Sequence, residues 1–409
     1  METWKTMTLS DVCYISSSKR IFAKEYQSSG IPFYRGKEII EKHNGISISN
    51  KLFISSERYE EIKNKFGVPL EGDILLTSVG TLGIPWLVDK EKFYFKDGNL
   101  TWLRNNELIT PRFLYYWLIT SQAQNQINSK CIGSTQKALT IEILKKFYIT
   151  FPDIKTQKKI TSIIESIELK IDNNRKINKN LEEQAQAIFK SWFVDFEPFG
   201  GIQPSEMQFI PLQELCKVVT KGTTPTTLGK SFTSTGINFI KAESILDNHS
   251  IDSSKFAFID EETNALLKRS VIKANDIVFT IAGTLGRFAM VDNSVLPANT
   301  NQAVAIIRPD ETKVTPAYLY SFFIGNWHNE YYSKRIQQAV QANLSLTTIK
   351  SLPIAVLKNT TMNNYDKLVS PLFALMKSNE EENRRLSKLR DTLLPRLMSG
   401  ELDVSNLDL

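Results

Sequence analysis

Gly80-Thr81-Leu82-Gly83 occurs a second time in this chain, as Gly283-Thr284-Leu285-Gly286. The residues before it also recur, because Asp73-Ile74-Leu75-Leu76-Thr77 corresponds to Asp276-Ile277-Val278-Phe279-Thr280. The interval is far longer than the 20–50 residues of solenoid repeats. A single duplication of this kind predicts two copies of one domain and a molecule with approximate two-fold symmetry. Such symmetry suits a target with two halves, such as duplex DNA.

Composition sets broad limits on the kind of protein. The chain has 409 residues, 42% of them hydrophobic, and a formal net charge of +6. The excess of Lys and Arg lies in residues 1–152 and 201–360, which contain the repeated segments. Phosphate contacts would place positive charge there, but a soluble protein of this size reaches +6 without any acidic partner. Charge alone therefore leaves both interpretations open.

Cellular location follows from what the sequence lacks. No run of about 18 apolar residues is present, so we expect no transmembrane helix. Residues 1–10 contain no apolar stretch of the secretory type. The three cysteines, Cys13, Cys131 and Cys216, are odd in number and widely spaced, which fits neither a disulfide framework nor a zinc site. These features predict a cytoplasmic protein with no membrane association.

Each repeat begins with a globular part. Residues 1–152 and 201–357 contain short apolar runs broken by Gly, Asn and Ser, a pattern typical of short buried strands joined by turns. Helices are expected to begin at Pro111 and Pro316, because proline is well tolerated in the first helical turn. Both segments are therefore predicted to be mixed α/β domains.

A long helix is predicted after each domain, within residues 153–200 and 358–409. Apolar residues recur every three or four positions, and two asparagines interrupt each series. The first series is Ile160, Ile164, Ile167, Ile171, Asn174, Asn178, Leu181, Ala185, Ile188 and Trp192. The second is Tyr365, Val369, Leu372, Met376, Asn379, Asn383, Leu386, Arg390, Leu393 and Leu397. Such spacing is typical of a coiled-coil seam.

The two seams most simply pair with each other. Antiparallel pairing would set Asn174 opposite Asn383 and Asn178 opposite Asn379, so that amide meets amide and apolar residues meet apolar residues. A parallel pairing would instead set Asn174 beside Asn379. A seam asparagine fixes the register because any other alignment leaves a buried amide unpaired. For the two helices, the alternatives are burial in an internal core and a coiled coil with a second chain. For the asparagines, the alternative is that polar residues stand at these positions by chance, on the helix surface.

A catalytic constellation is not evident. Leu228-Gly229-Lys230-Ser231 resembles the end of a phosphate-binding loop, but Thr224 stands where the first glycine is required. His43, His249 and His328 have no Cys or carboxylate at metal-ligand spacing. We therefore expect no metal and no cofactor in this chain. Two rival functions stay open: an enzyme acting on DNA (a nuclease or methyltransferase), and a coiled-coil scaffold with no nucleic-acid role.

Taken together, the duplication, the twin helices and the helix-end motifs resemble the specificity (S) subunit of type I restriction-modification systems. The resemblance covers essentially the whole chain. Its most specific parts are Ala187-Ile188-Phe189-Lys190-Ser191-Trp192-Phe193-Val194-Asp195-Phe196 and Leu394-Pro395-Arg396-Leu397-Met398-Ser399-Gly400-Glu401-Leu402. Pro152-Asp153-Ile154-Lys155-Thr156-Gln157 is similar to the motif with which the family begins its helices, except at Thr156. In the second copy that motif is lost, which leaves the helix start undefined there.

The resemblance implies a fold and a role. Two target recognition domains would each read one half of a bipartite double-stranded DNA site, and two antiparallel helices would hold the domains apart. The chain itself would be non-catalytic. It would recruit two modification subunits, which bind S-adenosylmethionine and methylate adenine. A restriction subunit using ATP and Mg would join where the system has one.

Candidate site residues fall into three groups. Base reading needs donors and acceptors in loops that face a groove, and phosphate binding needs Lys or Arg. The DNA-binding candidates are Lys19, Arg20, Arg35, Lys37, Ser78, Thr81, Lys221, Thr223, Thr224, Lys241, Thr284 and Arg287. The candidates for setting the coiled-coil register are Asn174, Asn178, Asn379 and Asn383. The candidates for a partner interface are Trp192, Phe193, Phe196, Leu397, Met398 and Leu402.

Overall fold

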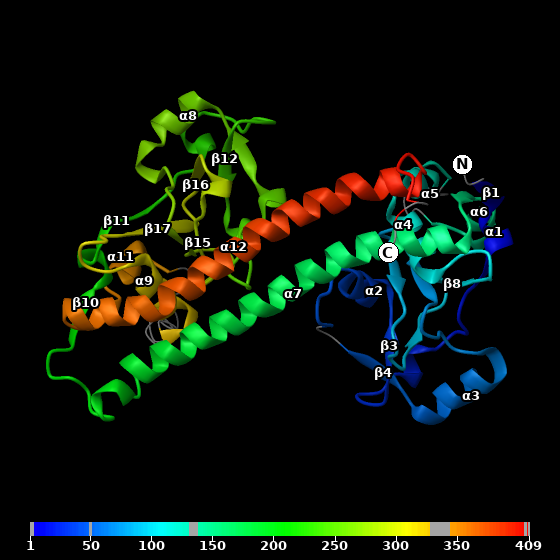
Figure 1. Cartoon of the computed structure of the whole chain (residues 1–409), viewed down its shortest axis with the longest axis horizontal. Helices are drawn as coiled ribbons and strands as arrows, with labels where there is room; N and C mark the ends of the chain where they lie inside the picture. The colour runs from blue at the N-terminus through cyan, green and yellow to red at the C-terminus, as the bar shows by residue number, and fades with distance from the viewer. Residues whose placement is uncertain (1–3, 49–50, 131–137, 328–343, 405–406, 408–409) are drawn as a thin grey trace. The chain divides into compact units, whose positions relative to one another are not determined.

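The computed structural model describes residues 4–48, 51–130, 138–327, 344–404 and 407. The chain forms two compact units (Figure 1), of which unit 1 is Met1–Asp172 with Asn383–Leu409 and unit 2 is Asn173–Glu382. Each unit contains one copy of the repeated domain and about half of each long helix. The division into units therefore cuts across both helices instead of following the order of segments along the chain.

Unit 1 is built on three small sheets. A four-stranded antiparallel sheet has the order β2-β8-β5-β6, a three-stranded sheet the order β4-β3-β7, and β1 pairs with β9. The bounds are β1 Lys5–Thr8, β2 Cys13–Ser16, β3 Ile31–Tyr34, β4 Leu52–Ile54, β5 Ile74–Thr77, β6 Pro85–Leu87, β7 Tyr94–Phe95, β8 Leu100–Asn105 and β9 Tyr148–Phe151. Its short helices are α1 Leu9–Val12, α2 Gly36–His43, α3 Ser56–Phe66, α4 Pro111–Ile119, α5 Ser121–Lys130 and α6 Ile141–Lys145.

Unit 2 repeats this plan. Its sheets have the orders β11-β17-β14-β15, β13-β12-β16 and β10-β18. The bounds are β10 Gln208–Pro211, β11 Cys216–Lys221, β12 Ile237–Ile240, β13 Ala257–Ile259, β14 Ile277–Thr280, β15 Phe288–Met290, β16 Ala298–Thr300, β17 Val304–Pro309 and β18 Pro353–Val356. The short helices are α8 Glu261–Leu266, α9 Pro316–Ile324 and α11 Leu346–Lys350. The prediction of two mixed α/β domains is therefore confirmed.

The duplication extends to backbone detail. Gly30 and Gly236 precede β3 and β12 with φ of 129° and 137°. An added Cβ would lie 2.4 Å from the carbonyl oxygen of Ile54 at Gly30, and 2.5 Å from that of Ile259 at Gly236. Only glycine fits so close to the neighbouring strand. The same constraint is therefore present in both copies.

Helices α4 and α9 begin as the two prolines predict. Pro111 and Pro316 are the first helical residues, and the hydroxyls of Thr110 and Thr315 cap the following turns by accepting from the amides of Phe113 and Tyr318. A threonine cap satisfies one of the amides left unpaired at a helix start. Both helices then bury apolar faces in the main core of their unit.

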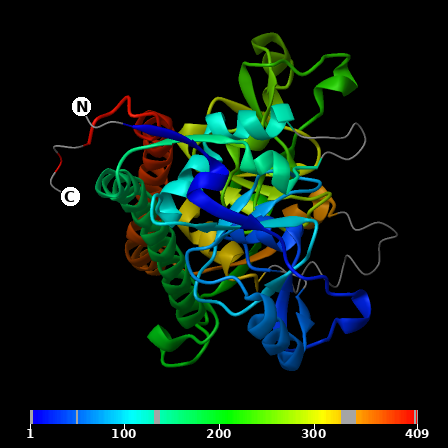
Figure 2. The same cartoon turned by 90° about the vertical axis from the view of Figure 1, so that its right-hand side faces the viewer.

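The two long helices are α7, Ile154–Phe193, and α12, Asn359–Met398. The start of the second, which the sequence left undefined, is thus Asn359. In unit 1 the first part of α7 packs on the last part of α12, with Ile160 and Ile164 in one core cluster with Leu397 (Figures 1 and 2). In unit 2 the end of α7 meets the start of α12, with the Phe193 and Tyr365 ring centroids 5.0 Å apart. The helices therefore run antiparallel, as predicted.

The seam departs from a strict heptad near the end of α7. Phe189 and Phe193 are 2% and 7% exposed, whereas the predicted seam residues Ile188 and Trp192 are only half-buried. A straight helix has 3.6 residues per turn, so its buried face drifts away from a 3.5-residue repeat. At this end of the helix the buried residues therefore lie one position after those that the sequence predicts.

The start of α7 is fastened by Gln157, which is fully buried. Its Oε1 accepts from the amide of Thr110 at 2.8 Å, and its Nε2 donates to the carbonyls of Leu108 and Pro152 at 2.9 Å each. The glutamine thus joins the start of α7 to the cap of α4. At the corresponding place in the second copy, Met362 is buried in the apolar core.

An asparagine pair lies in the seam of unit 2. The Nδ2 of Asn379 donates to the Oδ1 of Asn178 at 2.7 Å. Asn178 in turn donates to the carbonyl of Met376 and to Glu380, both at 3.1 Å. This pair is the one that the antiparallel register predicts, and the parallel alternative is wrong. The second predicted pair, Asn174 with Asn383, joins residues of different units and stays a prediction; Asn174 donates to Glu382 at 2.7 Å.

Replacing Asn379 with leucine should destabilise unit 2 by about 1–3 kcal/mol, because the buried Asn178 oxygen loses its donor. Changing both residues to leucine should cost less than the sum of the single changes, since no amide then lacks its partner. Urea denaturation of the four proteins measures this coupling. Asn173→Leu on the exposed face of α7 is the control. Additive effects would show that the pair does not set the register.

No helix among the described residues is both long and apolar enough to cross a membrane.

Candidate nucleic-acid interface

Three loops of unit 1 lie together at one end of the strands of its four-stranded sheet. Ser16 pairs with Trp102, Thr77 with Leu100, and Leu76 with Pro85. The end of β2, the start of β8, the end of β5 and the start of β6 therefore lie together. Residues 17–30, 78–84 and 96–99 leave the sheet there, and we call them the loop edge of unit 1.

The corresponding edge of unit 2 is built in the same way. Lys221 pairs with Ala305, Thr280 with Val304, and Phe279 with Phe288. The loops that leave this edge are residues 222–236, 281–287 and 301–303, which form the loop edge of unit 2. The duplicated sequence thus presents two matched loop edges, one in each unit.

The Gly-Thr-Leu-Gly turns are held rigidly at these edges. The hydroxyl of Thr77 accepts from the amide of Ile84 at 2.9 Å, and that of Thr280 accepts from the amide of Arg287 at 2.9 Å. Gly83 and Gly286 have φ of 76° and 83°, in the left-handed region that favours glycine. Thr81 and Thr284 remain exposed at the tips of the turns. The turns therefore present their tips from a fixed base.

In unit 1 the predicted cations lie at or beside the loop edge. Lys19 is exposed, its Nζ 4.3 Å from the Phe66 ring centroid, and it makes no ion pair with any described residue. Arg20 is 68% exposed and its Nε donates to Asp97 at 2.9 Å. Arg35 and Lys37 follow β3, whose parallel neighbour β7 leads into residues 96–99. Arg35 forms an ion pair with Glu38 at 2.6 Å, and Lys37 forms one with Glu41 at 3.6 Å.

Ser78 does not belong in the candidate set. Its side chain is 4% exposed, and its hydroxyl lies 2.6 Å from that of Thr101 and donates to the carbonyl of Leu76. Both bonds satisfy a polar group inside the domain. Ser78 therefore stabilises the base of the turn and offers nothing to a ligand.

In unit 2 the predicted residues also lie at or beside the loop edge. Lys221 and Thr284 are exposed, and Lys221 makes no ion pair with the described part of the chain. The Thr223 hydroxyl accepts from Arg269 at 3.3 Å, and the Thr224 hydroxyl donates to Gln302. Lys241 pairs with Glu243 at 3.2 Å, and Arg287 reaches both oxygens of Asp247 at 2.6 Å.

The ion pairs of Lys37 with Glu41 and of Lys241 with Glu243 are easily exchanged. Exposed pairs contribute only about 0–1 kcal/mol, because water screens them and the long side chains lose freedom. A phosphate could therefore replace Glu41 or Glu243 at little cost. The edges also include three residues that sequence patterns did not single out, namely Asp97, Arg269 and Gln302. Alignment of the two copies could have pointed to Asp97 and Gln302, since Asp97 lies three residues before β8 and Gln302 two residues before the equivalent β17.

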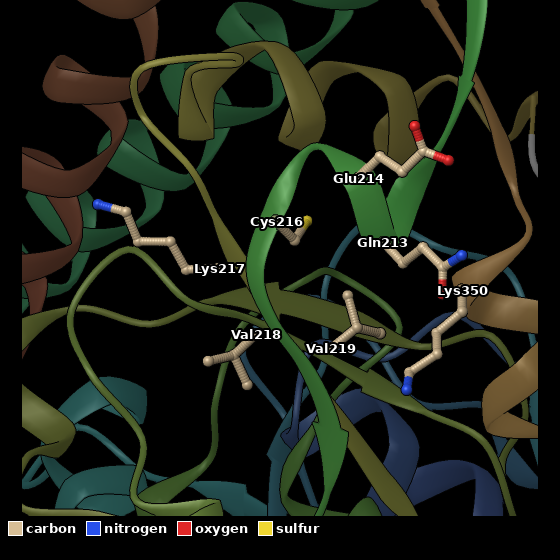
Figure 3. Close-up of a pocket in the computed structure, with 7 residues that line it drawn as sticks. All are labelled: Gln213, Glu214, Cys216, Lys217, Val218, Val219 and Lys350. Carbon is tan, nitrogen blue, oxygen red and sulfur yellow. The ribbon is translucent and has the colours of Figure 1, made fainter.

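A hollow of unit 2 lies at the opposite end of β11 from the loop edge (Figure 3). It is lined by Gln213, Glu214, Cys216, Lys217, Val218, Val219 and Lys350. Burial raises the pKa of the Cys216 thiol to about 12, so the sulfur stays protonated and is a poor nucleophile. No group of His, Cys, Asp and Glu among the described residues could hold a metal ion.

The residues predicted to form a partner interface are largely used inside the chain. Phe193, Leu397 and Met398 are 7%, 2% and 3% exposed and belong to the main cores of the two units. Trp192, Phe196 and Leu402 are half-buried against the same cores. Internal packing therefore accounts for the first three. Only the partly exposed residues keep surface for another protein.

Comparisons with known proteins agree on one family. The model described as "Type I restriction modification DNA specificity domain" matches residues 1–183 and 204–358. The type I restriction enzyme MjaIX specificity subunit of Methanocaldococcus jannaschii is 24% identical, over 99% of this chain and 94% of that protein. The HindI specificity subunit of Haemophilus influenzae is 24% identical, over 98% of this chain and 100% of that protein.

A solved structure has the same fold. The crystal structure of the S subunit of a type I restriction-modification system from M. genitalium aligns with 97% of this chain and 96% of its own. The TM-score is 0.58 at 16% sequence identity, so the likeness is one of fold.

Proposed function

The chain belongs to the family of type I restriction-modification DNA specificity domains, and we propose that it reads a bipartite DNA target, one half with each loop edge. DNA sequence recognition is the role of this family, and its specificity subunits are non-catalytic. The observation that carries the proposal is the pair of matched loop edges, each with exposed cations and rigid turns. Two copies of one reading surface suit a target with two half-sites.

The edges supply the two kinds of contact that specific DNA binding needs. Lys19 lies three residues after the end of β2, and Lys221 is the last residue of β11. Neither has a carboxylate partner among the described residues, so their charge is available for phosphates. Thr81 and Thr284 place a hydroxyl at the tip of each turn, where it can donate to or accept from a base edge. Phosphate contacts fix the orientation of a protein on DNA, and base contacts give specificity.

The chemistry of the complex is proposed to reside in partner subunits. Two modification subunits would bind S-adenosylmethionine and methylate adenine, and a restriction subunit would use ATP and Mg where the system contains one. The partly exposed Trp192, Phe196 and Leu402 support partner contacts near the helix ends. The complex would act in the cytoplasm, where Cys13 and Cys216 would persist as the free thiols found here.

The test is methylome sequencing of cells that express the chain with its modification subunits. We expect methylated adenines within one split sequence of fixed spacing. Labelled S-adenosylmethionine should be retained by the purified complex and not by the chain alone. Methylation by the chain alone would favour the enzyme alternative, and methylation of the same sequence by the modification subunits without the chain would contradict the proposal. A complex that binds all DNA equally would contradict the proposal.

The lysines give a quantitative prediction. Lys19→Ala or Lys221→Ala should weaken binding to all sequences and reduce the slope of log K against log salt by about 1, because one phosphate contact is lost. Fluorescence anisotropy at several salt concentrations measures this slope for the complex. Lys217→Ala is the matched control, because Lys217 lies on β11 with Lys221 but at the end away from the loop edge. An unchanged slope in both variants would place the phosphates elsewhere.

A further inference from the structure

Strand pairing identifies equivalent positions at the two loop edges. Ile15 of β2 pairs with Leu103 of β8, and Val219 of β11 pairs with Ile307 of β17. Arg20 and Thr224 follow Ile15 and Val219 at equal distances along the chain, so they occupy equivalent places. On the partner strands, Gly98 precedes Leu103 by the same number of residues as Gln302 precedes Ile307, so Gly98 and Gln302 are equivalent. Asp97 is the residue next to Gly98.

At each of the two equivalent residues, Arg20 and Thr224, a polar contact joins two loops of the edge. In unit 1 the Nε of Arg20 donates to Asp97 at 2.9 Å. In unit 2 the hydroxyl of Thr224 donates to the Oε1 of Gln302. Arg20 and Thr224 are equivalent, their partners Asp97 and Gln302 are offset by one residue, and the two pairs differ in chemistry, one charged and one neutral. A duplicated scaffold that reads two different half-sites would be expected to differ at such a place.

The backbone beneath each pair is fixed. In unit 1 the amide of Lys19 donates to the hydroxyl of the buried Tyr94 at 2.7 Å. In unit 2 the amide of Gly222 donates to the carbonyl of Asn301 at 3.1 Å. A Cβ on Gly222 would lie 1.8 Å from the carbonyl oxygen of Thr300, so only glycine permits this approach. An anchored side chain loses less conformational entropy when it binds a ligand.

The pairs leave the base-reading atoms available. The terminal nitrogens of Arg20 make no hydrogen bond within the described part of the chain, and its side chain is 68% exposed. The Nε2 of the exposed Gln302 likewise has no described acceptor, and its Oε1 keeps a second lone pair. Arginine offers two parallel donors that match O6 and N7 of guanine. Glutamine offers one acceptor and one donor that match N6 and N7 of adenine.

The surroundings favour bases over phosphates at both places. The carboxylate of Asp97 beside Arg20 repels a phosphate group, and Gln302 with Thr224 carries no charge to attract one. The unpaired Lys19 and Lys221 nearby are better suited to the DNA backbone. Building on the proposed DNA-reading function, we propose that Arg20 reads a guanine in one half-site and Gln302 reads an adenine in the other. Asp97 and Thr224 are positioning residues that orient the two readers.

The test compares the methylated motifs of wild-type and variant complexes, determined by methylome sequencing and by binding to a randomised site library. Arg20→Ala should relax one guanine position, and Gln302→Ala one adenine position in the other half. The loss of discrimination at each position should be roughly 5- to 150-fold. Arg20→Gln should move the first preference from guanine to adenine. Gln302→Arg should move the second from adenine to guanine.

The positioning residues and controls make the test decisive. Asp97→Ala and Thr224→Val should keep the preferred base but weaken discrimination at that one position, an effect that a general loss of stability would not produce. Lys217→Ala should leave the motif unchanged, and thermal melting checks that every variant folds.

Two different failures can be told apart. If the wild-type complex methylates no split sequence, the proposed function fails. If it methylates one, but Arg20→Ala and Gln302→Ala leave every base preference unchanged, or both relax the same half, this inference is overturned and the proposed function stands.

Discussion

Phe193→Ser is expected to destabilise unit 2 by about 3–5 kcal/mol, the cost of removing a large aromatic side chain from a packed core. Phe193 is 7% exposed, and its ring centroid lies 5.0 Å from those of both Tyr318 and Tyr365. The change opens a cavity where α7, α9 and α12 meet. Denaturation followed by intrinsic fluorescence should show an early transition for unit 2.

The neighbouring residue provides the control. Val194 is 36% exposed at the end of α7, so Val194→Ser should change stability by less than about 0.5 kcal/mol. Co-purification with a modification subunit should be measured for both variants. If Phe193→Ser keeps wild-type stability but loses the modification subunit, the residue belongs to an interface and its assignment to the core is wrong.

Lengthening both long helices together is expected to lengthen the spacer of the DNA target. Inserting one heptad after Asp172 in α7 and one after Glu382 in α12 adds residues only at the boundary of the two units. Seven residues extend a helix by about 10 Å, which corresponds to about three base pairs at 3.4 Å each. Duplicating residues 166–172 and 383–389 keeps the inserted sequence native to the chain. Methylome sequencing should then give the same half-sites with a longer gap.

The antiparallel pairing explains why both helices must change. A heptad inserted in α7 alone would either break the pair of Asn178 with Asn379 or strain the cores that hold α7 and α12 in each unit. That single insertion should therefore reduce stability and give no defined new spacer. An unchanged spacer in the double insertion, with folding intact, would rule out the helices as the element that sets the distance.

Several features follow from the sequence because they depend on local or periodic patterns. The duplication predicts two domains, and the strand orders of the two units are the same. Proline at the first helical turn locates α4 and α9. The two asparagines in each seam limit the register to alignments that pair amides, because an unpaired buried amide costs about 1–3 kcal/mol. A parallel and an antiparallel alignment both meet this condition, and the contact of Asn379 with Asn178 identifies the antiparallel one.

Other features depend on which segments meet in space, and these only the tertiary structure decided. Ser78 follows a strand and is predicted from the sequence to contact DNA, but its side chain is buried and its hydroxyl lies against that of Thr101 in the neighbouring strand. Phe193 replaces Trp192 in the core because the buried face of the helix drifts from the heptad and the domain of unit 2 covers it. The pair of Thr224 with Gln302 joins loops far apart in the chain. Periodicity in a sequence determines which face of an element is buried, but the neighbours of one side chain depend on contacts between distant segments, and no local pattern encodes those.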